Sequence, residues 1–126
     1  MLDEESTMDP NDWMEEYEGQ LAIDVYQTPT EIVLKAPIAG VRQEDLEVSI
    51  TDEHIVIKGE RHDTAQESVE GYFVQECYWG TFARTYDFPV GVDSDNASAK
   101  LVDGILTITV PKTAKARTRT LPVSLS

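Results

Sequence analysis

The amino-acid sequence predicts an all-β protein in which two sheets pack face to face as a sandwich. Three observations lead to this fold class. Short runs of alternating apolar and polar residues, about eight in all, recur along the chain between Gly, Pro and Asp residues. Helical periodicity is almost absent. Asp103-Gly104 joins the last two runs, and this dipeptide is a strong signal for a tight β-hairpin.

The first runs lie in the N-terminal part of the chain. One run covers residues 20–25, and a second carries Ile32 and Leu34 after a turn at Pro29. The pattern is then interrupted, and a single helical turn is expected at residues 42–45. We therefore expect two strands followed by a short irregular connection.

The next two runs form an expected hairpin. Residues 46–50 alternate between apolar and polar side chains, Asp52-Glu53 turns the chain, and residues 55–57 continue the pattern. Gly59 is expected to end the second strand. Residues 60–71 are polar, which predicts a long surface loop.

An apolar segment follows this loop, and a further strand comes after it. We predict a short strand made of Tyr72, Phe73, Val74 and Gln75. A strand isolated in a polar loop needs an external sheet edge to satisfy its backbone hydrogen bonds. Residues 81–88 alternate again, with Phe82, Arg84, Tyr86 and Phe88 on one side.

The closing hairpin has the clearest pattern in the chain. After the Asp103-Gly104 turn, Leu106, Ile108 and Val110 alternate with threonines, which predicts one apolar and one polar face. Pro111 cannot donate a backbone hydrogen bond, so it is expected to end the strand.

Composition narrows the class of partner and the compartment. The formal net charge of -14 argues against nucleic acid and anionic membranes, because both attract positive charge. No apolar run approaches the roughly 18 residues of a membrane span, and the acidic N-terminal end is unlike a secretory signal. Cys77 is the only cysteine, so we expect no intrachain disulfide and a cytoplasmic, reducing environment.

The reactive side chains give no support for an enzyme. His54 and His62 are the only histidines, and together with Cys77 they cannot complete a closed zinc site within one chain. The sequence contains no glycine-rich phosphate loop of the nucleotide-binding kind. We therefore expect no catalytic activity, no cofactor and no metal site.

Residues 1–19, called the arm below, are strongly acidic. Residues 1–18 contain no Lys or Arg, whereas the charged residues from Lys112 onward are all basic, so the two ends could attract each other between subunits. The arm is expected either to form a short helix or to be a disordered acidic segment. Its soft apolar side chains are candidates for binding other proteins: Met8, Trp13, Met14 and Tyr17.

The tail, residues 113–126, contains one apolar motif. Leu121 and Val123 project to the same side of an extended segment, and Pro122 between them favours that conformation. Such a segment can add to a sheet edge or fill two pockets in a groove. The alternative is a frayed terminus with incidental apolar residues.

Several motifs resemble those of the small heat-shock proteins, the α-crystallin family. Residues 99–112 read A-x-x-x-D-G-I-L-T-I-T-V-P-K, which is similar to the closing signature of that family. Further similar stretches are the Pro-Gly loop and acidic pair of residues 36–46, the strand ending in G-E at 55–61, and G-x-F-x-R at 80–84. The motif at residues 121–123 resembles the family's C-terminal I-x-I/V motif.

The resemblance implies an immunoglobulin-like β-sandwich at residues 20–112, between the arm and the tail. It implies that Leu121, Pro122 and Val123 anchor the tail in a groove of a neighbouring subunit. The implied groove residues are Leu46, Val48, Ile50, Ala99 and Leu101. It also implies a dimer made by exchange of the strand at residues 72–75, with Arg84 at the interface and a carboxylate as its expected partner.

The function implied by the resemblance is an ATP-independent holding chaperone. Such a protein would assemble with copies of itself, bind unfolding proteins and suppress their aggregation. The alternative is a p23-like co-chaperone, a binding module for one specific partner. The closing signature and the tail motif favour the first interpretation.

Overall fold

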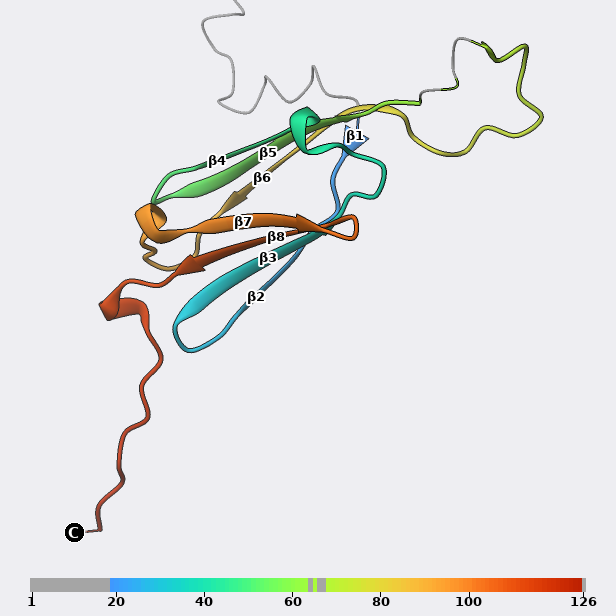
Figure 1. Cartoon of the computed structure of the whole chain (residues 1–126). Helices are drawn as coiled ribbons and strands as arrows, with labels where there is room; N and C mark the ends of the chain where they lie inside the picture. Colours follow the sequence, from blue (N-terminus) through green and yellow to red (C-terminus); the bar gives the residue numbers. More distant parts are fainter. Residues whose placement is uncertain (1–18, 64, 66–67, 126) are drawn as a thin grey trace, which may run out of the picture.

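The fold is a sandwich of two four-stranded sheets, seen in a computed structural model that describes residues 19–63, 65 and 68–125 (Figure 1). The first sheet has the order β1 (Gly19–Gln20), β6 (Gly80–Asp87), β5 (His54–Arg61) and β4 (Leu46–Ile50). The second has the order β2 (Asp24–Gln27), β3 (Glu31–Pro37), β8 (Ile105–Pro111) and β7 (Ser98–Val102). Three single turns of 3-10 helix complete the described chain: η3 (Gln43–Asp45), η5 (Ser94–Asn96) and η6 (Ala114–Ala116). The predicted all-β sandwich is confirmed.

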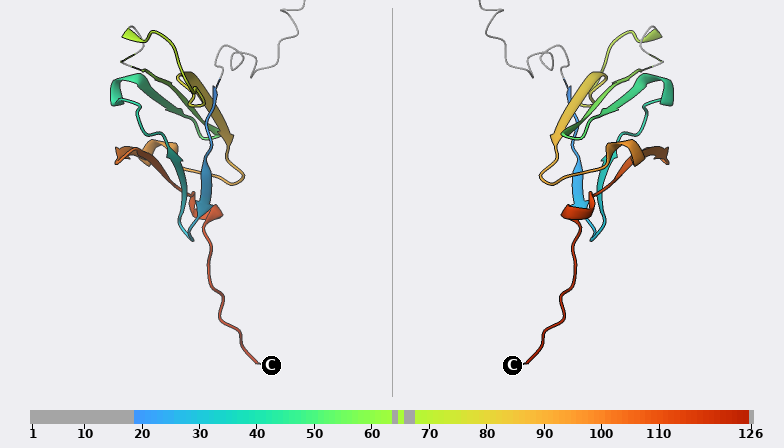
Figure 2. Two further views of the ribbon diagram at one scale, coloured as in Figure 1. Left: turned by 90° about the vertical axis from the view of Figure 1, so that its right-hand side faces the viewer. Right: turned by 90° about the vertical axis from the view of Figure 1, so that its left-hand side faces the viewer.

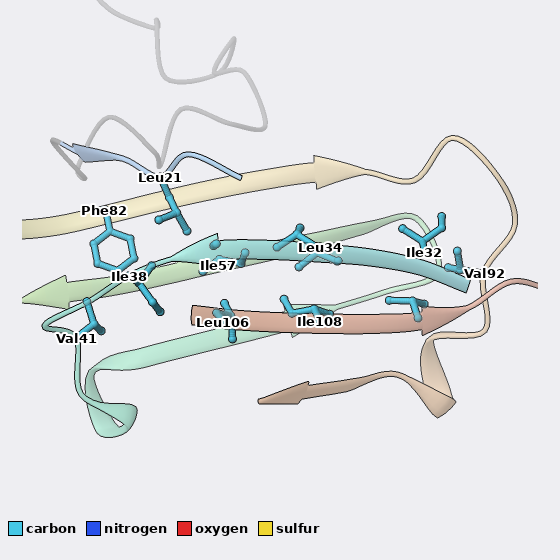
Figure 3. Packing of buried hydrophobic residues seen from close by; sticks show 13 residues of the cluster. Leu21, Ile32, Leu34, Ile38, Val41, Ile57, Phe82, Val92, Leu106 and Ile108 are labelled. Carbon is cyan, nitrogen blue, oxygen red and sulfur yellow. The ribbon is translucent and has the colours of Figure 1, made fainter. Parts of the chain in front are cut away.

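The core lies between the sheets and comes from alternate residues of the central strands. In β3 and β8 the paired residues Leu34 and Ile108 both point inward and are almost fully buried, as is Ile57 of β5 (Figure 3). Residues paired directly across an antiparallel ladder share one face of the sheet, so the sequence alternation becomes one continuous apolar layer. Burial of such aliphatic side chains contributes about 1.5–3 kcal/mol each.

The closing hairpin forms as the sequence predicts. Asp103 and Gly104 have φ angles of 53° and 78°, the left-handed values that a two-residue hairpin turn of this type requires. The Ile38 N–H donates to the Gly104 carbonyl at 2.7 Å, which attaches the turn to the end of β3. A side chain at position 104 would also crowd Ala39, so glycine fits this turn for two reasons.

The run predicted at residues 20–25 divides between the two sheets. Gly19 pairs in parallel with Phe82 in the first sheet, whereas β2 begins at Asp24 in the second sheet. Leu21 lies between these strands with its side chain buried in the core. The apolar alternation continues where the chain passes from the first sheet to the second, because Leu21 and Val25 both point into the core between the sheets.

The strand predicted at residues 72–75 does not form within the chain. This segment lies in the long connection between β5 and β6, which projects beyond the ends of both strands (Figure 1). Tyr72, Phe73 and Val74 are all exposed. Without a hydrogen-bonding partner in the described chain the segment is not a strand here, and its pairing with the sheet edge of another molecule stays a prediction.

Candidate functional site

The candidate surfaces lie along the two sides of the sandwich, where each sheet ends. The edge strands β4 and β7 lie on one side, and β2 lies with β6 on the other (Figures 1 and 2). Within the described chain β4 pairs only with β5, β7 only with β8, and β2 only with β3. Each of these three strands therefore presents one free row of backbone hydrogen-bonding groups.

The first side collects the residues predicted for the groove. Leu46, Val48 and Ile50 of β4 pair with Gly59, Ile57 and Ile55 of β5, so they point inward, yet they remain half-buried. Leu101 of β7 is also half-buried against the core.

Ala99 of β7 shows how incompletely this side is covered. It pairs with the buried Ile108 and so points inward, yet it is exposed. The inner faces of β4 and β7 therefore form an apolar surface that the described chain covers only in part. We call this surface the β4–β7 face.

Carboxylates surround the beginning of β4. A cavity of about 260 Å³ there is lined by residues of η3, β4, β5 and β6: Glu44, Asp45, Leu46, Glu47, Lys58, Gly59, Glu60 and Thr81. Leu46 is its one large apolar side chain. Four carboxylates and one lysine, Lys58, thus line this cavity.

The opposite side holds a cavity that sequence reasoning missed. It has a volume of about 390 Å³ and is lined mainly by apolar and aromatic residues: Val25, Tyr26, Gln27, Ile32, Tyr86, Pro89 and Val90. These residues come from β2, β3 and β6 and from the connection after β6. The apolar Pro89-Val90 pair was visible in the sequence, but its position beside β2 depends on the order of strands across both sheets.

Arg84 lies on β6 near this second side and is half-buried. Its Nη1 donates to the Leu21 carbonyl at 2.9 Å. No carboxylate of the described residues lies within ion-pair distance of it, so a carboxylate partner for Arg84 stays a prediction. The β1–β6 ladder ends at Gln20, and the guanidinium satisfies the next carbonyl instead.

The two segments predicted to contact other subunits both project from the domain. Phe73 is fully exposed in the connection between β5 and β6. Leu121 and Val123 are 78% and 92% exposed on a tail that runs away from the sheets (Figure 2). Thr118 N–H donates to the Pro29 carbonyl at 3.0 Å, so the tail is attached to the β2–β3 turn up to this residue.

Comparison with known proteins establishes the family. The sequence model of the Hsp20/alpha crystallin family matches residues 24–124. The chain belongs to the Hsp20/alpha crystallin family. The match includes both edge surfaces, the connection between β5 and β6, and the tail motif.

Individual members of the family support this assignment. Spore protein SP21 of Stigmatella aurantiaca is 33% identical over 105 residues, which are 83% of this chain and 62% of that protein. Small heat shock protein C2 of Rickettsia felis is 30% identical over 79% of this chain and 65% of its own length. The matched region thus spans less than two thirds of these relatives.

Solved structures of family members share the fold. Heat shock protein 16.0 from Schizosaccharomyces pombe has a TM-score of 0.73 and 29% identity, covering 86% of this chain and 100% of that one. A small heat-shock protein from Xylella fastidiosa has a TM-score of 0.67 and 29% identity, covering 84% and 94%.

The reactive side chains of this Hsp20 domain are dispersed. The described residues contain no group of three or more His, Cys, Asp or Glu side chains that could hold a metal ion. His62 Nε2 lies 3.5 Å from Glu60 Oε1 and 3.7 Å from Asp45 Oδ2, on the surface beside η3. His54 begins β5, and Cys77 is exposed in the connection before β6. No helix in the described part of the chain could cross a membrane.

The Asp52 carboxylate on the surface links the β4–β5 turn to the segment at Ser94 by hydrogen bonds. Asp52, in the β4–β5 turn, accepts hydrogen bonds from the Ser94 hydroxyl at 2.6 Å and from the Ser94 N–H at 3.3 Å. Hydrogen bonds to the ionised carboxylate, chiefly the one from the Ser94 hydroxyl and then the one from the Ser94 N–H, hold the pKa of Asp52 below its ordinary value of 3.8.

The predicted client-binding residues of the arm lie outside the described residues: Met8, Trp13, Met14 and Tyr17.

Proposed function

We propose that this protein is an ATP-independent holding chaperone that binds unfolding proteins in the cytoplasm and suppresses their aggregation. One observation carries the proposal: the domain combines uncovered apolar edge surfaces with exposed apolar segments of its own. Extended segments bind sheet edges through backbone hydrogen bonds and apolar pockets, which are also the contacts that an unfolded chain offers. Membership of a chaperone family supports the same role.

In the assembled state the tail motif occupies the β4–β7 face of a neighbouring subunit. Leu121 and Val123 are nearly fully exposed in the single chain, and the inner faces of β4 and β7 are only half covered. Alternate side chains of an extended tail would meet this apolar surface while its backbone meets a free strand edge. Pro122 reduces the conformational entropy lost when the tail docks.

The dimer forms by strand exchange on the other side of the sandwich. The segment of Tyr72, Phe73, Val74 and Gln75 adds to the free edge of β2 in a second copy. β2 has four residues, Asp24–Gln27, so the two segments match in length. The apolar cavity beside β2 offers space for an aromatic side chain of the incoming strand. Arg84, close to this side, is the proposed interface residue.

Client binding follows when subunits separate and these surfaces become free. The arm, residues 1–19, contributes Met8, Trp13, Met14 and Tyr17 as adaptable apolar contacts. In this proposal the sandwich domain at residues 20–112 provides the scaffold, and residues 113–126 control assembly.

The test is the light scattering of a heat-aggregating protein mixed with an equal mass of this chain and no nucleotide. We expect suppression of scattering. No suppression, with the chain shown to be folded by circular dichroism, would contradict the holding role and favour a module for one dedicated partner. Leu125→Ser is the matched control for a variant of the tail motif, Leu121→Ser/Val123→Ser, because Leu125 is an exposed tail residue outside that motif.

A further inference from the structure

The outer face of the second sheet carries an apolar row that no described residue covers. Pro37 of β3 pairs with Ile105 of β8, and Ile105 pairs with Val102 of β7. All three point outward, because their sequence neighbours Ala36, Leu106 and Leu101 point into the core. Ile105 and Val102 are 42% and 56% exposed, and Pro37 is also exposed.

The next row on the same face is basic. Lys35, Thr107 and Lys100 pair across β3, β8 and β7, with both lysines exposed. Neither ammonium has an ion-pair partner among the residues that the structure describes. Lys35 Nζ lies 6.0 Å above the centre of the Tyr26 ring. We call these two rows the outer β3–β8–β7 face.

Negative charge near this face is limited. Asp24 pairs with Lys35 at the β2 edge, and Asp103 occupies the hairpin turn. Lys35 and Lys100 flank Thr107 beside the apolar row, so this face is less acidic than the chain as a whole, which has 24 acidic and only 10 basic residues. A partner that is both acidic and apolar would complement both rows.

The arm has that chemistry. Within residues 1–18 eight residues are acidic and none is basic, and the apolar side chains Trp13, Met14 and Tyr17 stand among the acidic ones. We propose that this segment docks on the outer β3–β8–β7 face of its own chain.

The path of the chain supports docking within one molecule. The arm joins the domain at β1, and Leu21 just after it packs in the core near Phe82 and Ile38 (Figure 3). The Ile38 N–H in turn donates a hydrogen bond to the Gly104 carbonyl, in the turn of the β7–β8 hairpin. The arm thus enters at the end of the sandwich that carries Val102 and Ile105. An extended chain spans about 3.3–3.6 Å per residue, so the arm can cross that end and reach the outer face.

Docking would hide the apolar side chains of the arm and would weaken with salt. Interactions between exposed charges are screened beyond about 8 Å at physiological ionic strength. The arm would then regulate access to its own client-binding residues. This consequence rests on the proposed chaperone function, whereas the docking itself does not.

Carbodiimide cross-linking of the full-length protein at low salt tests the docking, since this reagent joins carboxylates directly to lysines in contact. We expect links from carboxylates of residues 9–18 to Lys35 or Lys100. Lys35 is the first cation in the sequence, so chymotrypsin must be used with trypsin to separate it from the arm. The links should fall as the salt concentration is raised, because docking depends on screened charges, and they should be retained in the matched control Lys115→Glu.

Other cross-linking patterns would overturn the proposal. Links from the arm mainly to Lys115 of the tail would indicate attraction between opposite ends of subunits instead. No arm link to either lysine of the face would also contradict docking. A mixture of ¹⁵N-labelled and unlabelled protein identifies the chain of origin, and links found only between chains would refute docking within one molecule. A result in either direction is independent of whether the protein suppresses aggregation.

Discussion

The Lys112 ammonium lies 2.6 Å from Gln27 Oε1 and is almost completely buried. Lys112 directly follows β8, and Gln27 ends β2, so this hydrogen bond joins the root of the tail to the edge strand of the second sheet. The Lys112 N–H also donates to the Thr30 carbonyl at 2.8 Å. The tail and the proposed dimer edge therefore share one anchoring point.

Gln27→Leu should destabilise the domain by about 1–3 kcal/mol, because it leaves a buried ammonium without its partner. Urea unfolding measures this difference. Gln27→Leu/Lys112→Met should recover most of the loss, since replacing both partners by apolar groups can be nearly neutral. An unchanged midpoint for the single Gln27 variant would show that the hydrogen bond contributes nothing to stability.

Asp52→Asn should lower the thermal midpoint at neutral pH. The pKa of Asp52 is lower in the folded state than the ordinary 3.8, so its ionised form stabilises the fold above that pH. The contribution is lost as the pH falls through the folded-state pKa, so the wild type and the variant should converge in acid. Ser94→Ala should show the same pH dependence. A difference in midpoint that persists unchanged at low pH would argue against the ionised hydrogen bond as its cause.

Leu121→Ser/Val123→Ser should reduce the size of the assembly measured by size-exclusion chromatography with light scattering. Each aliphatic side chain contributes about 1.5–3 kcal/mol when buried, so losing two weakens the tail contact by a factor of roughly one hundred or more. Leu125→Ser, also in the exposed tail, should leave the size unchanged. Equal sizes for all three proteins would exclude the tail motif as the anchor.

Arg84→Ala should weaken the dimer measured by sedimentation equilibrium. Hydrogen bonds to charged groups contribute about 1.5–3 kcal/mol, which corresponds to a roughly tenfold to hundredfold rise in the dissociation constant. Arg42→Ala is the matched control, because among the described residues the Arg42 guanidinium makes just one ion pair, an exposed one with Glu44 at 3.4 Å. An unchanged dissociation constant for Arg84→Ala would rule out its interface role.

Local sequence signals predicted the elements that depend on neighbouring residues. Asp103-Gly104 needs only its own backbone angles, and the helical turn expected at residues 42–45 appears as η3. The alternation of β4 followed from period two, whereas the groove residues of β4 and β7 were implied by the resemblance to the small heat-shock proteins, and strand pairing shows only that their side chains point inward.

Features that depend on distant partners were not predictable in this way. The passage of the chain from the first sheet to the second at Leu21 does not interrupt the apolar–polar alternation, because both sheets face one core, so the sequence pattern does not reveal it. The carbonyl that binds Arg84 belongs to a residue 63 positions away, and backbone carbonyls carry no sequence signal. The cavity beside β2 likewise combines residues from separate strands.

The Thr118–Pro29 hydrogen bond has a geometric consequence for any assembly. Because this hydrogen bond attaches the chain to the β2–β3 turn, the unattached part of the tail begins after Thr118 and not at the end of β8. Val123 is five positions after Thr118, and at about 3.3–3.6 Å per residue an extended chain of this length spans roughly 17 Å. If a neighbouring domain receives Val123 as proposed, it must lie within that distance of Thr118, and the Thr118–Pro29 hydrogen bond would then limit the spacing between subunits.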